Sequence, residues 1–134
     1  MDKIGGGIEA DFERKIEYLH KIGESTLVNN PKSMLGYFLP VMQKIILNIL
    51  AKKQQHNCVL QRVTVLSLCK YMTVSKVVCK DNLKLLFTLL SSNIIDSITK
   101  TNIIISLGDL MHRYPNITEP FTKRLYDKYL LEHF

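Results

Sequence analysis

The 134-residue sequence lacks several features that membrane, secreted and zinc-binding proteins require. No apolar stretch approaches the roughly 18 uninterrupted residues of a membrane span, and Asp2 and a glycine run stand where a signal peptide would be apolar. We therefore expect an intracellular protein with no membrane contact. The three cysteines show neither CxxC nor histidine spacing, which predicts buried thiols without a disulfide framework or zinc site.

Catalytic motifs are also missing. The sequence has no Walker loop, HExxH, GxSxG or EF-hand pattern. The glycine run at 5–7 lacks the lysine and Ser/Thr of a phosphate-binding loop, so residues 1–9 are predicted to be a flexible segment. The histidines are too widely separated to pair as metal ligands: His20, His56, His112 and His133. We therefore expect that the protein is not an enzyme and that it has no cofactor, metal or small-molecule substrate.

Amphipathic helices dominate what is present. Apolar residues recur at i, i+3, i+4 and i+7, which predicts an all-α fold. A short helix is expected around Ile8 to Leu19. Pro40 and Pro120 would occupy first-turn positions, and Asp81 would cap the helix that follows it. The remaining helices are predicted near 40–52, 58–72, 80–91, 99–113 and 119–133.

The helices repeat with a period near 40 residues. Adding 40 carries Ile45, Ile46, Ile49 and Leu50 onto four leucines, and adding 40 again reaches Leu125, Tyr126, Tyr129 and Leu130. Two helices per unit at this period are typical of HEAT and armadillo repeats. The sequence therefore predicts a HEAT/armadillo-like α-solenoid of antiparallel helix pairs over residues 10–134, about two and a half repeats long. Its A helices are 40–52, 80–91 and 119–133, and its B helices are 58–72 and 99–113.

Basic residues recur with the same period. The chain has 18 Lys and Arg against 12 Asp and Glu, a net charge of +6 that favours anionic partners. Lys44, Lys84 and Arg124 occupy equivalent positions in three A helices, off the apolar face. We expect a basic ridge that binds the DNA backbone, broadened by Lys76 and Lys80. The alternative for each residue is an ordinary solubilising charge on a helix surface.

Four residues in the second predicted B helix are expected to have structural roles. Lys100 is expected to form an ion pair with a neighbouring repeat. Asp109 and Arg113 are an i, i+4 pair worth about 0.2–0.5 kcal/mol if exposed. Gly108 lowers helix propensity, so close approach of an adjacent helix is its expected reason.

Several short motifs follow one another in a specific order. They are Leu-Leu-Phe-x-Leu at 85–89, Lys100-Thr101-Asn102, Gly108-Asp109-Leu110 and the corner His112-Arg113-Tyr114-Pro115-Asn116. This order resembles the family of HEAT-repeat regulatory subunits 1 of condensin, the D2-type subunits. The resemblance extends from about Phe12 to Tyr126, and Lys100 replaces the arginine expected there, which loses the planar guanidinium.

The resemblance implies a non-catalytic subunit of an ATP-driven complex that compacts mitotic chromosomes. It implies kleisin and SMC subunits as partners, contact with double-stranded DNA or chromatin, and a location in the nucleus and on chromosomes with a cytoplasmic pool. The alternative is a generic HEAT-repeat adaptor of transport or coat type that grips peptides or proteins. An enzyme ranks third, because no catalytic constellation is present in the sequence.

Overall fold

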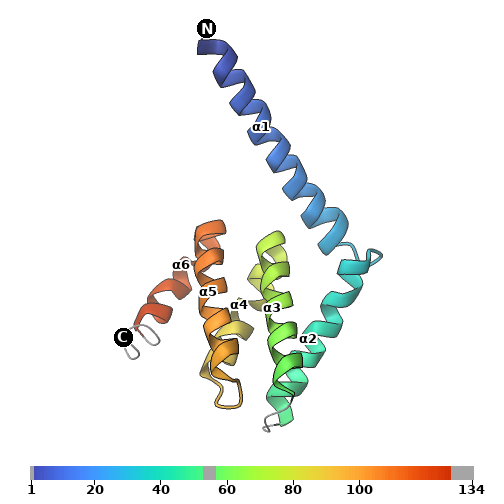
Figure 1. Ribbon diagram of the computed structural model, residues 1–134, viewed down its shortest axis with the longest axis vertical. Coiled ribbons are helices and arrows are strands. Elements are labelled where there is room, and N and C mark those ends of the chain that lie inside the picture. The colour runs from blue at the N-terminus through green and yellow to red at the C-terminus, as the bar shows by residue number, and fades with distance from the viewer. Residues whose placement is uncertain (1, 53–56, 128–134) are drawn as a thin grey trace.

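The computed structural model describes residues 2–52 and 57–127, in which all regular structure is helical (Figure 1). The all-α prediction is confirmed. The elements in chain order are α1 (Asp2–Ile22), the π-helix η1 (Gly23–Val28), α2 (Met34–Lys52), α3 (Cys58–Val74), α4 (Lys76–Ser91), α5 (Ser97–Arg113) and α6 (Pro115–Leu125).

The helices pack as successive pairs. Figure 1 shows α3 and α5 side by side with α4 behind them, α2 on one flank and α6 on the other. The A helices of the predicted repeats are thus α2, α4 and α6, and the B helices are α3 and α5. This arrangement confirms the HEAT-like prediction. The final residues of the predicted third A helix, including Tyr129 and Leu130, lie outside the described residues.

The core lies where the repeating apolar stripes meet. Ile46 of α2, Leu86 of α4 and Leu125 of α6, related by the period of 40, are all buried. The B helices contribute fully buried side chains from their facing sides, because each repeat can bury its apolar stripe only against its neighbours. These side chains are Val65, Leu68 and Met72 of α3 and Ile103, Leu107 and Leu110 of α5.

Side-chain caps fix the starts of three helices. Asn57 accepts hydrogen bonds from the N–H groups of the first turn of α3, and Ser75 does the same for α4. Asp96 caps α5 by accepting from the N–H of Thr99 at 2.9 Å. The prediction that Asp81 caps its helix is wrong, because α4 begins at Lys76 and Asp81 is exposed within it.

Two prolines lie deeper in their helices than predicted. Pro40 is inside α2, which begins six residues earlier at Met34, and Pro120 is inside α6. A proline removes the hydrogen bond to the residue four positions before it and crowds the carbonyl of that residue, which can kink a helix without ending it. Pro115 takes the first-turn position of α6, where its missing N–H costs nothing.

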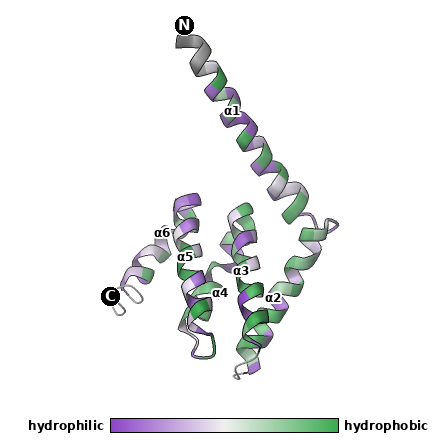
Figure 2. Ribbon diagram, viewed as in Figure 1, coloured by the Kyte–Doolittle hydropathy of each residue, from purple (hydrophilic) through white to green (hydrophobic). Residues whose placement is uncertain are grey.

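The first helix is longer than predicted. Residues 2–9 belong to α1, although the sequence placed residues 1–9 in a flexible segment. No proline stops the helix upstream of Ile8, and propagation continues through the glycines despite their cost of about 1 kcal/mol each. In Figure 1, α1 projects away from the stack, and Figure 2 shows hydrophobic and hydrophilic residues alternating along it. The flexibility of residues 1–9, and the boundary at residue 10, stay predictions.

Among the described helices, α2 alone is long and apolar enough, by length and composition, to cross a membrane. The sequence predicts no span because no apolar stretch approaches roughly 18 uninterrupted residues; in α2 the run is interrupted by Gln43, Lys44 and Asn48. A single helix of this kind does not establish a membrane span, and 17% of its apolar 18-residue window is buried in the structure. In this structure Ile46 and Ile49 of α2 are buried in the hydrophobic core.

Candidate nucleic-acid interface

The predicted basic ridge lies on three successive A helices. Lys44, Lys84 and Arg124 are exposed on α2, α4 and α6 respectively. Beside the first two, Nε2 of Gln43 donates a 2.9 Å hydrogen bond to Oδ1 of buried Asn82, 39 residues away. This bond links α2 to α4 at a separation one residue short of the 40-residue period.

Arg124 also contacts the neighbouring A helix. Its guanidinium carbon lies 5.7 Å from the ring centroid of Phe87 in α4. Phe121 of α6 stacks on the same ring, with centroids 5.3 Å apart and planes 19° from parallel. A cation–π contact of this kind is worth about 0.5–1 kcal/mol at an exposed site. Arg124 therefore has a packing role in addition to any role in binding.

Lys76 and Lys80 lie with Lys84 on one wall of a groove. Together with other residues of α4 and α6, they enclose a cavity volume of about 720 Å³. We call this hollow the α4–α6 groove, and its remaining lining residues are Val77, Asp81, Leu83, Asn116, Ile117 and Phe121. Sequence reasoning found the lysines but missed the groove. Their i, i+4 spacing is the signal that places them on one helix face.

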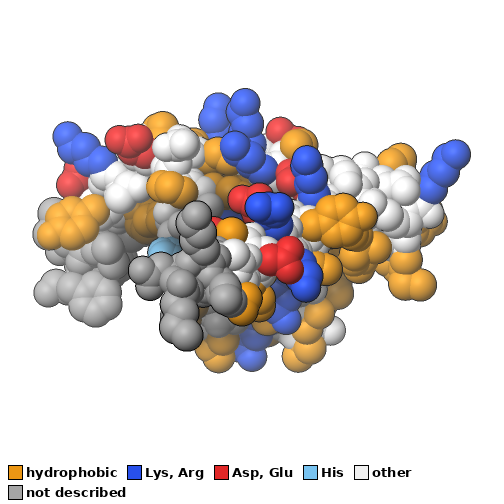
Figure 3. All heavy atoms as spheres, turned by 90° about the horizontal axis from the view of Figure 1, so that it is seen from above, with side chains coloured by type: hydrophobic (Ala, Val, Ile, Leu, Met, Phe, Trp, Pro, Cys, Tyr) orange, Lys and Arg blue, Asp and Glu red, His pale blue; other side chains and the backbone are white. Residues whose placement is uncertain are grey.

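Charges of both signs share the surface. Seen from above, in Figure 3, Lys and Arg side chains are interspersed with Asp, Glu and hydrophobic side chains rather than gathered in one continuous patch. A mixed surface weakens long-range attraction for a polyanion but leaves room for local phosphate contacts. The face seen in Figure 3 is therefore not uniformly basic.

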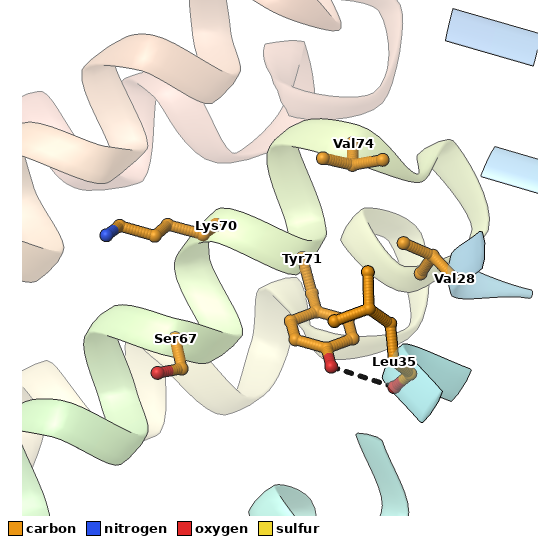
Figure 4. Close-up of a pocket in the computed structure, with 6 residues that line it drawn as sticks. All are labelled: Val28, Leu35, Ser67, Lys70, Tyr71 and Val74. Atoms are coloured by element: carbon orange, nitrogen blue, oxygen red, sulfur yellow. Dashed lines mark hydrogen bonds between the residues drawn. The ribbon is translucent and has the colours of Figure 1, made fainter. Parts of the chain in front are cut away.

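A second hollow is mainly apolar. Val28 of η1, Leu35 of α2 and Val74 of α3 line a cavity of about 270 Å³ with Ser67, Lys70 and Tyr71 (Figure 4). The hydroxyl of Tyr71 donates a 2.8 Å hydrogen bond to the carbonyl of Leu35. Burial raises the pKa of Tyr71 further above neutral pH, where the phenol is protonated in any case. This pocket was not predicted from the sequence, since its residues are far apart in the chain.

The cysteines are packed thiols. Cys69 and Cys79 are buried, and Cys58 is half-buried. Burial raises the pKa of Cys79 to about 11, so its thiol is protonated and unreactive at neutral pH. Over residues 2–52 and 57–127, no group of three or more His, Cys, Asp or Glu side chains is placed to hold a metal ion.

Three structural interpretations of the α5 region need correction. Among the described residues, neither Lys100 nor Asp109 has an ion-pair partner, and Arg113 lies over the ring of Tyr114 at 5.4 Å. A β-carbon added at Gly108 would meet nothing within 4 Å, so no adjacent helix requires this glycine. The ion pair between repeats is instead formed by Arg62 and Asp96, at a separation of 2.6 Å.

The packed helix pairs define the class to which the chain belongs, an α-helical repeat protein of HEAT type. The chain is homologous to a short segment of condensin complex subunit 1, as the resemblance in its motifs predicted. That protein from Xenopus laevis is 38% identical over 120 residues, which cover 90% of this chain and 8% of the relative.

Similar relatives occur in plants and yeast. Condensin-1 complex subunit CAP-D2 of Arabidopsis thaliana is 31% identical over 123 residues, covering 90% of this chain and 8% of the relative. Condensin complex subunit 1 of Saccharomyces cerevisiae is 31% identical over 126 residues, covering 94% of this chain and 10% of the relative. No protein-family model and no solved structure matches the chain. The chain thus spans about a tenth of these relatives or less.

Proposed function

We propose that this chain acts as a non-catalytic scaffold segment of a condensin regulatory subunit. In this role it supports mitotic chromosome condensation by binding kleisin and SMC partner subunits and the backbone of double-stranded DNA. It would work in the nucleus and on chromosomes. Homology to condensin complex subunit 1 in a vertebrate, a plant and a yeast supports the condensin assignment.

The observation that carries the DNA-binding part is the register of Lys44, Lys84 and Arg124. All three are exposed, one on each successive A helix, and contacts between neighbouring helices hold the helices together beside them. Each can neutralise a phosphate, and Lys76 and Lys80 extend the cationic surface along α4. Contacts of this type position a protein on duplex DNA without reading base sequence.

Charge reversal tests the ridge. We expect substitution of Lys44, Lys84 and Arg124 by glutamate to weaken binding to unrelated DNA duplexes equally. The slope of log affinity against log salt concentration should fall by about 2–3, because three phosphate contacts are lost. A matched control with the same change in net charge is Lys21, Lys32 and Lys70 to glutamate, all exposed residues that lie outside α4 and α6. Unchanged, salt-sensitive affinity in the ridge variant would contradict this part of the function.

A generic HEAT-repeat adaptor is the second candidate function. The apolar hollow around Leu35 and Tyr71 favours it, because peptide-binding surfaces combine apolar pockets with a few polar groups. An adaptor would bind a peptide or protein with no affinity for duplex DNA. Fluorescence anisotropy with labelled duplexes at several salt concentrations therefore separates the two functions.

A further inference from the structure

We propose that the α4–α6 groove binds an acidic protein segment that also presents apolar side chains. The proposal deepens the partner-binding part of the proposed function and rests on it. It assigns the groove to a protein segment, and because Lys84 lies both in the groove and on the ridge, the segment and the DNA backbone would compete for this lysine. The groove offers two kinds of recognition side by side, a row of cations and an apolar floor.

The row of cations lies on α4. Lys76, Lys80 and Lys84 follow one another at i, i+4, which separates them by about 6 Å each along the helix axis. Among the described residues that line this groove, Asp81 is the one acidic side chain, so their charges sum to a positive value. An acidic helix with carboxylates at i, i+4 has the same spacing and complements the row.

The floor of the groove is apolar. Val77 is 53% exposed on α4, and Ile117 and Phe121 of α6 are half-buried. Covering these side chains removes apolar surface from water, which favours a ligand with apolar groups of its own. A phosphodiester backbone presents no apolar groups at its charged edge. The floor therefore favours a protein segment over nucleic acid at this groove.

Both walls of the groove are held in place. The stacked rings of Phe87 and Phe121 fix α6 against α4. The N-terminus of α4 is capped by Ser75, and the carboxylate of Glu24 accepts a 3.0 Å hydrogen bond from the N–H of Lys76. A groove whose walls are already positioned loses little entropy when a ligand binds. Its volume of about 720 Å³ accommodates one face of a helix rather than a folded domain.

Fluorescence anisotropy with synthetic peptides tests the assignment. The probe is a fluorescein-labelled peptide of about 18 residues, long enough to form a helix, with leucine at i, i+3, i+4 and i+7 and glutamate elsewhere. We expect it to bind the 134-residue chain. One control peptide replaces glutamate by lysine, and a second replaces leucine by serine. Each should bind about tenfold more weakly or not at all, because each loses one kind of recognition.

A double substitution tests whether the acidic peptide binds in the α4–α6 groove. Val77→Asp with Lys80→Glu should weaken the acidic peptide about tenfold, because it adds charge to the floor and reverses the central cation. The matched control is Val63→Asp with Lys123→Glu, which changes net charge equally at exposed positions outside the groove; Val63 is 57% exposed. Circular dichroism should show equal helix content in both variants.

Two results would overturn the assignment. The first is no binding of the acidic amphipathic peptide, or equal loss in the groove variant and its control. The second is a groove variant that loses duplex DNA while its peptide affinity is unchanged, which would make the groove a phosphate site. If the peptide fails while the ridge variant still loses DNA, only the groove inference falls. If the peptide binds while DNA does not, only the DNA-binding proposal falls.

Discussion

The guanidinium of Arg62 in α3 holds the carboxylate that caps the next B helix. Its Nε and Nη2 atoms lie 2.7 and 2.6 Å from Oδ2 of Asp96. The other carboxylate oxygen accepts from the N–H of Thr99, and the N–H of Asp96 itself donates to Oε1 of Gln61 at 3.1 Å. One side chain therefore serves as a helix cap and as the link between adjacent repeats.

Replacing Asp96 by alanine should destabilise the chain. The loss of the cap alone costs about 0.5–2 kcal/mol. The variant also leaves the half-buried guanidinium of Arg62 without its carboxylate. We expect a lower urea midpoint with an unchanged slope of unfolding free energy against urea concentration. The control is Asp109→Ala, an exposed residue within α5, which should change stability by less than about 0.5 kcal/mol. Equal midpoints for the two variants would refute the linking role.

The ionisation of Asp96 should make the stability of the fold depend on pH. Burial acts to raise the pKa of Asp96, but hydrogen bonds from Thr99 and the ion pair with Arg62 outweigh it and hold the pKa below its ordinary value. The charged form is therefore favoured in the folded state. The charged carboxylate stabilises the folded state fully above the unfolded-state pKa of about 3.9. This stabilisation is lost as the pH falls through the folded-state pKa.

Unfolding free energies at several pH values measure this effect. Asp96→Asn keeps a cap but cannot ionise, so wild type should exceed it in stability by a constant amount above about pH 5. The difference should shrink as the pH is lowered toward 3, because wild type then loses the charge. The control is Asp109→Asn, which makes the same chemical change at an exposed position within α5. A difference that stays constant across this range would show that ionisation of Asp96 does not contribute.

The register of the fold could be predicted from the sequence because it depends on repeated apolar spacing. Residues 40 apart, such as Ile46 and Leu86, are both buried. The partners of Arg62 could not be predicted, since a separation of 34 residues corresponds to no helical spacing and follows only from stacking. Helix starts were misplaced at Pro40 and Pro120 because α2 and α6 begin upstream of these prolines, at Met34 and Pro115, and Pro115 takes the first-turn position of α6 instead.

The candidate site was predictable in part for the same reason. The positions of Lys44, Lys84 and Arg124 on successive A helices follow from the period. The α4–α6 groove does not, because its floor joins Val77 to Ile117 and Phe121 across two helices whose separation depends on how their rings pack. Surface hollows depend on side-chain packing in three dimensions, which a one-dimensional pattern does not contain.

Gly36 should be intolerant of any side chain. A β-carbon there would overlap the backbone carbonyl of Asn30, lying 2.7 Å from its carbon, and would be 3.0 Å from Oγ of Ser33. Backbone atoms cannot rotate away as a flexible side chain can. We expect Gly36→Ala to cost about 1–3 kcal/mol, despite the better helix propensity of alanine. Thermal unfolding followed by circular dichroism measures the loss, and a melting temperature at or above that of wild type would contradict the close approach.

Gly108 provides the opposite case in a helix of the same fold. It is exposed within α5, and a β-carbon would meet nothing within 4 Å. The folded state therefore gains no unfavourable contact, while the unfolded chain loses conformational freedom. We expect Gly108→Ala to stabilise the chain by about 0.5–1 kcal/mol and to raise the urea midpoint. Because Gly36→Ala is the same chemical change, opposite signs for the two variants would show that local space, and not intrinsic propensity, decides the role of each glycine. A destabilised Gly108→Ala would mean that the native chain has a close contact at this position.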